Sequence, residues 1–266
     1  MFKQPQDFMD ESNALYSLIH DKSDIELGSA TQFKSWTIEE IISHLHVWNM
    51  AAHMSLTDAE KFNEFLGEVM QALPQGNLRE FERKWLNGLK GSKLVKTWHD
   101  FAQTLGTSFA DADPKSRLPW AGPSMSARSS ITARLMETWA HGLAIYDLLG
   151  VERADEDRVE NIVILGLNTF AWTFKCNGKE VPKDVPYLKL TAPSGKIWEY
   201  GTPDENNIVV GNATEFCQVI TQTRNIADTA LKTQGDTAQQ WMSIAQCFAG
   251  PPEPPPAKGS RFVKSG

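Results

Sequence analysis

Hydrophobic residues recur at helical spacing through the first 150 positions of the chain. Apolar side chains three or four positions apart predict amphipathic helices in DFMDESNALYSLIHD, from Ile38 to Ala52, in SLTDAEKFNEFLGEVMQAL and between Leu78 and Leu105. The segment DADPKSRLPWAGPSMS is expected to be a loop. A further helix is expected to begin near Ser129 or Ser130 and to end before Gly150, which fits a left-handed C-terminal cap.

The second of these helices has the clearest start signal. In SWTIEE, Thr37 can accept a hydrogen bond from the backbone three residues later, and Glu40 can reach back to the backbone of Thr37. The periodic apolar run begins directly after this pair, at Ile38. The sequence therefore predicts a capping box at Thr37.

Beyond Gly150 the hydrophobic period changes. ILGLNTFAWTF, TEFCQVITQTRN and DTAQQWMSIAQCF are expected to be helical, PYLKLTAPSGKIWEYG alternates like a β-hairpin, and NNIVVGN is expected to be a further strand. The closing segment PPEPPPAKGSRFVKSG is rich in proline and cannot continue a helix. We therefore predict an α+β protein with a helical domain at residues 1–150, a small α/β domain at 151–250 and a proline-rich tail at 251–266.

Charge and composition exclude several classes of partner. The chain has 33 acidic and 26 basic residues and a formal charge of −7, which argues against binding to nucleic acid. No apolar run is long enough to span a bilayer, and the amino end lacks the apolar core of a signal peptide, so we expect a cytoplasmic protein that does not bind membranes. The three cysteines show neither a disulfide framework nor a zinc motif.

The segment METWAHGLAIYDLLG carries the candidate chemistry. Glu137 and His141 stand four residues apart, so their side chains lie about 40° apart around a helix and can meet at one point. They are either an ordinary helix-stabilising pair or two ligands of a metal ion. Arg134, three residues before Glu137, is expected to pair with that carboxylate or to contact an anion.

A metal site needs a third ligand, and SHLHVWN offers two candidates. His44 lies on one flank of the apolar stripe of its helix and His46 lies on the other, so periodicity leaves both possible. Two histidines and one glutamate would give zinc three protein ligands and leave a fourth position for water, a thiol or a substrate. Such an open position is typical of catalytic zinc sites.

Several motifs spread from Trp36 to Pro252 carry a family resemblance: SWTIEEIISHL, ETWAHG, LTAPSG, DTAL and AQCFAGPP. Together they resemble the mycothiol-dependent maleylpyruvate isomerase family. The resemblance implies a DinB-like four-helix bundle followed by a small α/β domain similar to sterol carrier proteins. It also implies a divalent metal, usually zinc, held by His44, Glu137 and His141, so that His46 is not a ligand.

The resemblance also points to one catalytic residue and one departure. Arg224, in TQTRNIAD, matches an arginine of the C-terminal domain that would bind the carboxylate of a substrate or thiol cofactor bidentately. The alternative for Arg224 is a surface position at a helix end. Close relatives continue AHG with Gln-Asp, where this chain has Leu143-Ala144. An aspartate there could orient His141, so its absence leaves room for a changed reaction.

These features predict a divalent-metal-dependent enzyme that uses a low-molecular-weight thiol and acts on a small unsaturated or electrophilic acid. The reaction would be cis/trans isomerisation, as for maleylpyruvate, or thiol transfer. The alternative is a non-catalytic metal-containing protein that binds a hydrophobic small molecule. A fourth protein ligand would favour the alternative, because a closed site cannot activate a substrate. The sequence does not indicate an oligomeric state.

Overall fold

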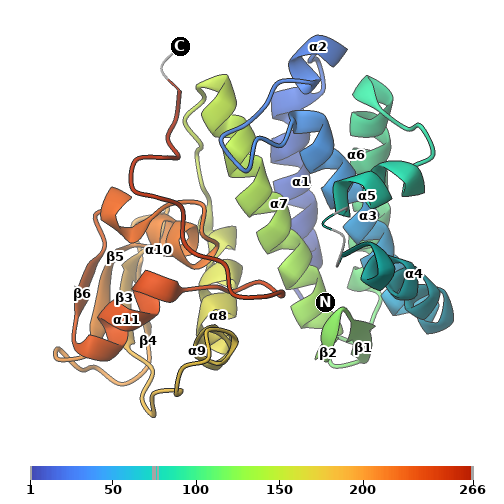
Figure 1. Ribbon diagram of the computed structural model, residues 1–266. Helices are drawn as coiled ribbons and strands as arrows, with labels where there is room; N and C mark the ends of the chain where they lie inside the picture. Colours follow the sequence, from blue (N-terminus) through green and yellow to red (C-terminus); the bar gives the residue numbers. More distant parts are fainter. Residues whose placement is uncertain (1, 74–75, 77, 265–266) are drawn as a thin grey trace. The chain divides into compact units, whose positions relative to one another are not determined.

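The computed structural model describes residues 2–73, 76 and 78–264. The chain forms two compact units, residues 1–148 and 149–266 (Figure 1). The helices of the first unit are α1 (Gln4–Ile19), α2 (Asp24–Leu27), α3 (Ile38–Thr57), α4 (Ala59–Ala72), α5 (Leu78–Trp85), α6 (Gly91–Ala110) and α7 (Ala127–Leu149). Its two strands are β1 (Arg117–Trp120) and β2 (Gly122–Ser126).

Local capping sets the boundaries of the helices that matter for the site. The predicted capping box is confirmed: the Thr37 hydroxyl accepts from Glu40 N at 3.1 Å and Glu40 Oε2 accepts from Thr37 N at 3.0 Å. The expected helix SLTDAEKFNEFLGEVMQAL is divided, because Asp58 ends α3 and its side chain caps the new helix α4. Gly150 follows α7 with a φ of 68°, as the sequence predicts.

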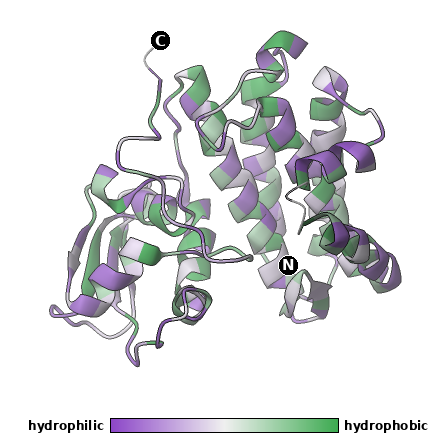
Figure 2. Cartoon of the chain, viewed as in Figure 1, coloured by the Kyte–Doolittle hydropathy of each residue, from purple (hydrophilic) through white to green (hydrophobic). Residues whose placement is uncertain are grey.

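The core of the first unit lies between its long helices. α6 packs against both α1 and α3, and fully buried aromatic side chains such as Trp98, Phe109 and Phe8 fill the interior. α1 and α6 approach closely at Gly106, where a Cβ atom would lie 2.3 Å from Met9 Cγ. Hydrophilic residues dominate the exposed surfaces of α4 and α5 (Figure 2).

The segment expected to be a loop between α6 and α7 is instead a β-hairpin. β1 and β2 pair antiparallel, with a register shift between Leu118 and Trp120. Pro119 has no backbone N–H to donate to a strand partner. For that reason the sequence of this segment does not predict a strand. The hairpin belongs to the first unit, because Ser55 of α3 and Pro119 are joined by a hydrogen bond from the serine hydroxyl to the proline carbonyl. Among the described residues, no helix is long and apolar enough to cross a membrane.

The second unit is a small mixed sheet with helices. Its helical segments are η2 (Asp157–Val159), α8 (Glu160–Asn168), α9 (Phe170–Cys176), α10 (Ala213–Ile220), η3 (Ile226–Asp228) and α11 (Asp236–Ile244), where η denotes a short 3-10 helix. Its strands are β3 (Tyr187–Thr191), β4 (Ile197–Tyr200), β5 (Ile208–Asn212) and β6 (Lys232–Gln234), in the sheet order β4-β3-β5-β6. β3 and β5 are parallel, and the two outer strands pair antiparallel with them.

Most of the elements expected after Gly150 are present, and the α+β class is confirmed. The hairpin of PYLKLTAPSGKIWEYG and the strand in NNIVVGN are β3, β4 and β5. TEFCQVITQTRN is helical only as far as Ile220, because Gln222 adopts a left-handed conformation with a φ of 56°. The helix expected in ILGLNTFAWTF is divided at Thr169.

The proline-rich tail is bonded to the second unit through the loop after α10. Gln222 Nε2 donates to the carbonyl of Glu253 at 2.8 Å, and Asn225 Nδ2 donates to the carbonyl of Pro256 at 2.8 Å. Arg261 in turn donates to the carbonyl of Gln222 at 2.6 Å. The segment from Glu253 to Arg261 therefore holds the loop that carries Arg224.

The capping box gives a direct test of how α3 is stabilised. Replacing Thr37 with alanine removes the acceptor for Glu40 N, so we expect the free energy of unfolding to fall by about 1 kcal/mol. Thr57→Ala is the control, since the exposed Thr57 hydroxyl donates to the His53 carbonyl within the same helix and takes no part in capping. Chemical denaturation followed by far-ultraviolet circular dichroism measures both. Equal stabilities of the two variants would contradict the role of the cap.

Candidate metal centre

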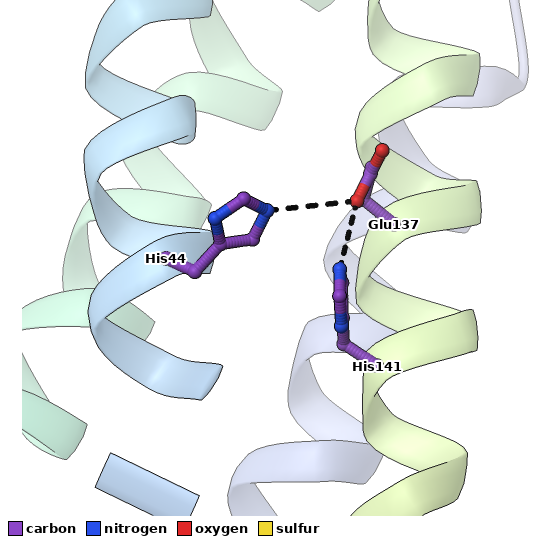
Figure 3. Close-up of side chains that lie close together, drawn as sticks. All are labelled: His44, Glu137 and His141. Carbon is purple, nitrogen blue, oxygen red and sulfur yellow. Dashed lines mark ion pairs between the residues drawn. The ribbon is translucent and has the colours of Figure 1, made fainter. Parts of the chain in front are cut away.

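Three potential metal ligands from two helices meet in the first unit. His44 comes from α3, and Glu137 and His141 come from α7 (Figure 3). Glu137 Oε2 lies 3.1 Å from His141 Nε2 and 3.8 Å from His44 Nε2. One ligand atom from each of the three residues lies within 4.8 Å of the other two. Two segments about 90 residues apart in the sequence thus converge on one carboxylate oxygen.

A second carboxylate, Glu82 of α5, orients His44. The Nδ1–H group of His44 donates to Glu82 Oε1 at 2.7 Å, and the indole of Trp48 donates to the same oxygen at 3.1 Å. The Glu82 side chain is only 1% exposed. Because the carboxylate holds Nδ1, Nε2 of His44 is the nitrogen left to face Glu137 and to act as a ligand. Sequence reasoning missed Glu82.

The charges of the cluster shift the pKa values of its members. Burial disfavours the ionised form of Glu137, but hydrogen bonds from His141 and His44 outweigh it and hold the pKa of this carboxyl well below its ordinary value. Burial also lowers the pKa of His44, yet the negative charge of Glu82 and the contact with Glu137 raise that pKa to about 9. Burial lowers the pKa of His141. The carboxylate of Glu137 is therefore ionised and available as a ligand near neutral pH.

Two aromatic side chains from the segment before α3 cover the histidines. The Trp36 ring stacks on the His141 ring with a centroid distance of 5.8 Å and an interplanar angle of 2°, and it meets His44 edge-on at 5.3 Å. Phe33 packs edge-on against His141 at 5.0 Å. A ring held on two sides has few alternative orientations, so Trp36 and Phe33 restrict the His141 imidazole, and Trp36 restricts His44 on one side.

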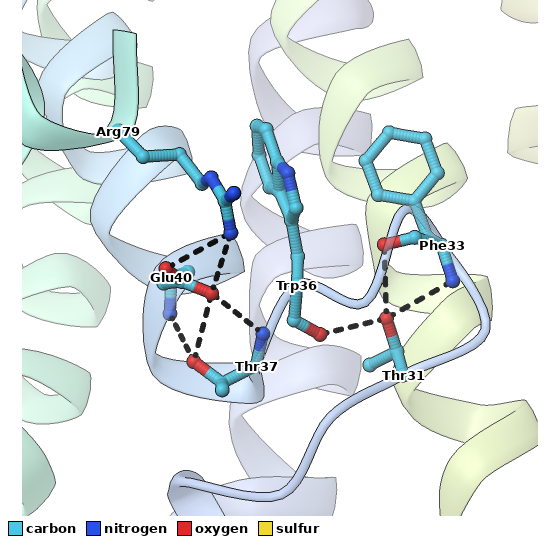
Figure 4. Close-up of polar contacts among 6 residues, drawn as sticks. All are labelled: Thr31, Phe33, Trp36, Thr37, Glu40 and Arg79. Carbon is cyan, nitrogen blue, oxygen red and sulfur yellow. Dashed lines mark hydrogen bonds and ion pairs between the residues drawn. The ribbon is translucent and has the colours of Figure 1, made fainter. Parts of the chain in front are cut away.

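Hydrogen bonds keep these aromatic residues in place (Figure 4). The Thr31 hydroxyl donates to the Trp36 carbonyl at 2.9 Å and accepts from the Phe33 amide at 3.2 Å. Arg79 of α5 lies 5.8 Å from the Trp36 ring and bonds to Glu40 of the capping box at 3.2 Å. The start of α3 therefore positions the aromatic cover as well as His44.

His46, the other candidate ligand, does not join the cluster. Its side chain is buried and packs edge-on against Phe101 of α6 at 5.5 Å. Burial lowers its pKa to about 4, so this imidazole is neutral. His46 is a core residue on the opposite flank of α3 from His44.

Arg134 does not pair directly with Glu137. Its Nε donates to Asn49 Oδ1 of α3 at 3.1 Å, and both side chains are buried. Its positive charge nevertheless contributes to the lowered pKa of Glu137. The guanidinium therefore acts on the carboxylate at longer range.

Arg224 belongs to the second unit. It follows α10 in the loop held by the tail, and its Nη1 donates to the carbonyl of Thr223 at 3.0 Å. The Arg224 guanidinium therefore contacts the backbone of its own loop. Its role in binding a substrate stays a prediction.

The His44, Glu137 and His141 donor set fits a divalent metal ion. In a tetrahedral site with bond lengths of about 2.0–2.1 Å, ligand atoms lie roughly 3.3 Å apart. The separations of 3.1 and 3.8 Å around Glu137 Oε2 are close to that spacing. Among the described residues, the cluster contains these three ligands and no fourth His, Cys, Asp or Glu. This arrangement matches an open zinc site, and the same ligands also suit iron, cobalt or nickel.

The raised pKa of His44 predicts a pH dependence of stability for the metal-free protein. Between the ordinary value of 6.5 and about 9, the folded protein binds a proton at His44 that the unfolded chain has lost. The contribution of His44 to stability is therefore complete below pH 6.5 and is lost as the pH rises through 9, by about 3 kcal/mol. Denaturation between pH 6.5 and 9 should show this decline, and a smaller decline in Glu82→Gln, because the contact with Glu137 that also raises the pKa of His44 remains. The exposed neighbour Glu80→Gln is the control, and an unchanged decline in Glu82→Gln would contradict the assignment.

Comparisons with known proteins identify the family of the chain. The profile of the mycothiol maleylpyruvate isomerase N-terminal domain matches residues 8–146. Two uncharacterized proteins from two strains of Mycobacterium tuberculosis are each 34% identical over 246 residues, covering 92% of this chain and 95% of theirs.

Two solved structures resemble the chain. They are the crystal structures of the mycothiol-dependent maleylpyruvate isomerase and of a histidine-to-alanine mutant of it, at 16% and 15% identity. Both have a TM-score of 0.49, and the matches cover 82% of this chain and 85% of those. The family profile spans more than half of the 266 residues and contains all three clustered residues. The chain therefore belongs to the mycothiol maleylpyruvate isomerase family.

Proposed function

We propose that the protein is a divalent-metal-dependent enzyme that uses a low-molecular-weight thiol and acts on a small unsaturated or electrophilic acid. The observation that carries this proposal is the cluster of His44, Glu137 and His141. Three protein ligands would leave the fourth position of a tetrahedral ion to water, a thiol or a substrate. Membership of the family supports a thiol, with mycothiol as the first candidate. Zinc is the first candidate for the metal, because two imidazoles and one carboxylate are a common catalytic zinc set.

A divalent ion held here would supply a Lewis acid that keeps a bound thiol in its thiolate form near neutral pH. The protein contributes an ionised Glu137 and two imidazoles in fixed orientations. Glu82 holds the proton on Nδ1 of His44, and Trp36 and Phe33 restrict the His141 ring. These contacts fix the directions of the ligand atoms before the ion binds. The protein would therefore determine the coordination geometry of the ion.

The reaction proposed is reversible addition of the thiol to a conjugated double bond. Addition forms a carbon–sulfur bond and turns the double bond of the substrate into a single bond. The two halves of the substrate can then rotate about that bond. Elimination then returns the thiol and gives the trans isomer. If the adduct is released instead, the outcome is thiol transfer. Arg224 is proposed to bind a substrate carboxylate through its two parallel donors.

One cavity of the second unit is polar. It has a volume of about 320 Å³ and is lined by Asp184, Asp204 and Asp236 together with two asparagines. Pockets for apolar molecules are lined mainly by apolar side chains. This cavity therefore does not support the alternative of a protein that binds a hydrophobic small molecule, whereas the ligand cluster and the family support the enzyme.

Metal content tests the ligand set. Protein purified without a metal-affinity tag is expected to contain close to one equivalent of metal by elemental analysis, and His44→Ala and His141→Ala are expected to lose most of it. Each substitution removes one of three ligands, whereas the exposed His20→Ala is the control and should retain the metal. Wild-type protein that neither contains nor takes up zinc in a titration would overturn the metal centre.

Turnover tests the chemistry. Metal-loaded protein is expected to isomerise maleylpyruvate only when a thiol such as mycothiol is present, and Glu137→Gln should lower the rate by more than about 100-fold. Glu80→Gln, on the exposed face of α5, serves as the matched control. If the protein holds the metal but shows no thiol-dependent reaction with unsaturated or electrophilic acids, the non-catalytic alternative is favoured instead.

A further inference from the structure

A row of buried polar side chains extends along α7 beyond the metal ligands. Ser130, Arg134, Glu137 and His141 follow one another at intervals of four, three and four residues, which places them on one face of the helix. Ser130 and Arg134 are 1% and 2% exposed. The chain thus keeps a guanidinium group inside the first unit, one turn from the candidate ligand Glu137. A buried charge is costly, so its retention calls for an explanation.

The partner of Arg134 fixes the guanidinium without neutralising it. Nε and Nη2 of an arginine point the same way and together match the two oxygens of a carboxylate. Here Asn49 occupies that side, and its single oxygen accepts only from Nε, at 3.1 Å. Asn49 has the shape of aspartate but no charge. The positive charge of Arg134 is therefore held in place and remains uncompensated by its direct partner.

The surroundings of this pair contain an excess of hydrogen-bond donors. The donors Arg134 Nη2 and Asn49 Nδ2 are buried and find no hydrogen-bond partner among the described residues, and neither does the Ser130 hydroxyl, which can donate or accept. Buried donors without acceptors create a positive potential. The charge of Arg134 reaches the ligands, since it contributes to lowering the pKa values of both Glu137 and His141.

A purely structural link between α3 and α7 would not need a charge. A neutral hydrogen-bonded pair would join the two helices without the desolvation penalty of a guanidinium. The effect of the Arg134 charge follows from the sum of the formal charges around the metal position. A dication and two neutral imidazoles, with Glu82 and Glu137 ionised, are electrically neutral together. Arg134 changes that total to one positive charge.

We propose that Arg134, held by Asn49, is a positioning residue that gives the metal centre a net positive charge and so favours an anionic fourth ligand over a neutral one. This inference rests on the proposed metal-dependent function. Arg134 and Asn49 would therefore affect metal binding and anion binding in opposite directions. The extra charge weakens binding of the dication, and it strengthens binding of an anion at the open position.

Two variants remove this charge by different routes. Asn49→Asp replaces the amide with an isosteric carboxylate that can accept from both Nε and Nη2 of Arg134, whereas Arg134→Gln deletes the cation. We expect both variants to bind zinc more tightly, on the order of tenfold in dissociation constant, because a repulsive charge near the dication is neutralised. Competition with a chromophoric chelator measures these constants. Arg134→Lys keeps the charge and should remain within about threefold of wild type.

Anion binding should change in the opposite direction. In cobalt-loaded protein, titration with azide followed by the visible spectrum is expected to show several-fold weaker binding in both Asn49→Asp and Arg134→Gln. Asn63→Asp is the matched control, since it adds the same charge at an exposed position of α4 and should change neither constant. Thermal denaturation of each metal-free variant identifies any variant that does not fold, and the other then decides the test.

The outcomes separate this inference from the proposed function. Wild-type protein that binds no metal would overturn both. Wild-type protein that binds zinc, together with folded variants that bind zinc equally or less tightly, would overturn the role of Arg134 alone, because loss of a structural link weakens metal binding. Tighter zinc binding combined with weaker azide binding supports the inference, since a structural role does not produce that reversal.

Discussion

The ionised carboxylate of Glu137 is the constraint on which the rest of the first unit's polar interior depends. An isolated carboxylate cannot remain charged inside a helical core, so every polar group around it has to supply compensation. His141 and His44 approach its Oε2 atom, and Arg134 adds a positive charge from the next turn. A divalent cation would take over much of this compensation. The same carboxylate therefore determines the spacing of the ligands and the electrostatic balance of the core.

The residues that surround the candidate metal ligands come from short segments that are separate in the sequence. The capping box at Thr37 starts α3 at a fixed residue, which determines the face that His44 occupies. The loop before it supplies the aromatic cover, and α5 supplies both Glu82 and Arg79. Because each of these groups contacts another member of the set, loss of one disturbs several. Such mutual support is typical of sites with preorganised ligands.

Much of this was predictable from the residues, and the reasons for the remainder are physical. The capping box, the Glu137–His141 spacing and the cap at Gly150 are local, so a few neighbouring residues determine them. The choice between His44 and His46 required a family resemblance, because both flanks of the helix are buried. Glu82 looks no different in sequence from the exposed Glu80. Only the packing of α5 against α3 brings it to an imidazole. Likewise, Pro119 conceals the hairpin before α7.

The proline-rich tail constrains how the length of the chain can vary. The loop that carries Arg224 donates hydrogen bonds to the carbonyls of Glu253 and Pro256 and accepts one from Arg261, so its conformation is not encoded by its own residues alone. Each of these three hydrogen bonds has a backbone carbonyl as its acceptor, and a carbonyl keeps its place when its own side chain changes but not when the length of the chain changes. Among homologues, insertions and deletions in the tail should therefore be rarer than substitutions, and they should accompany changes in the length of the Arg224 loop.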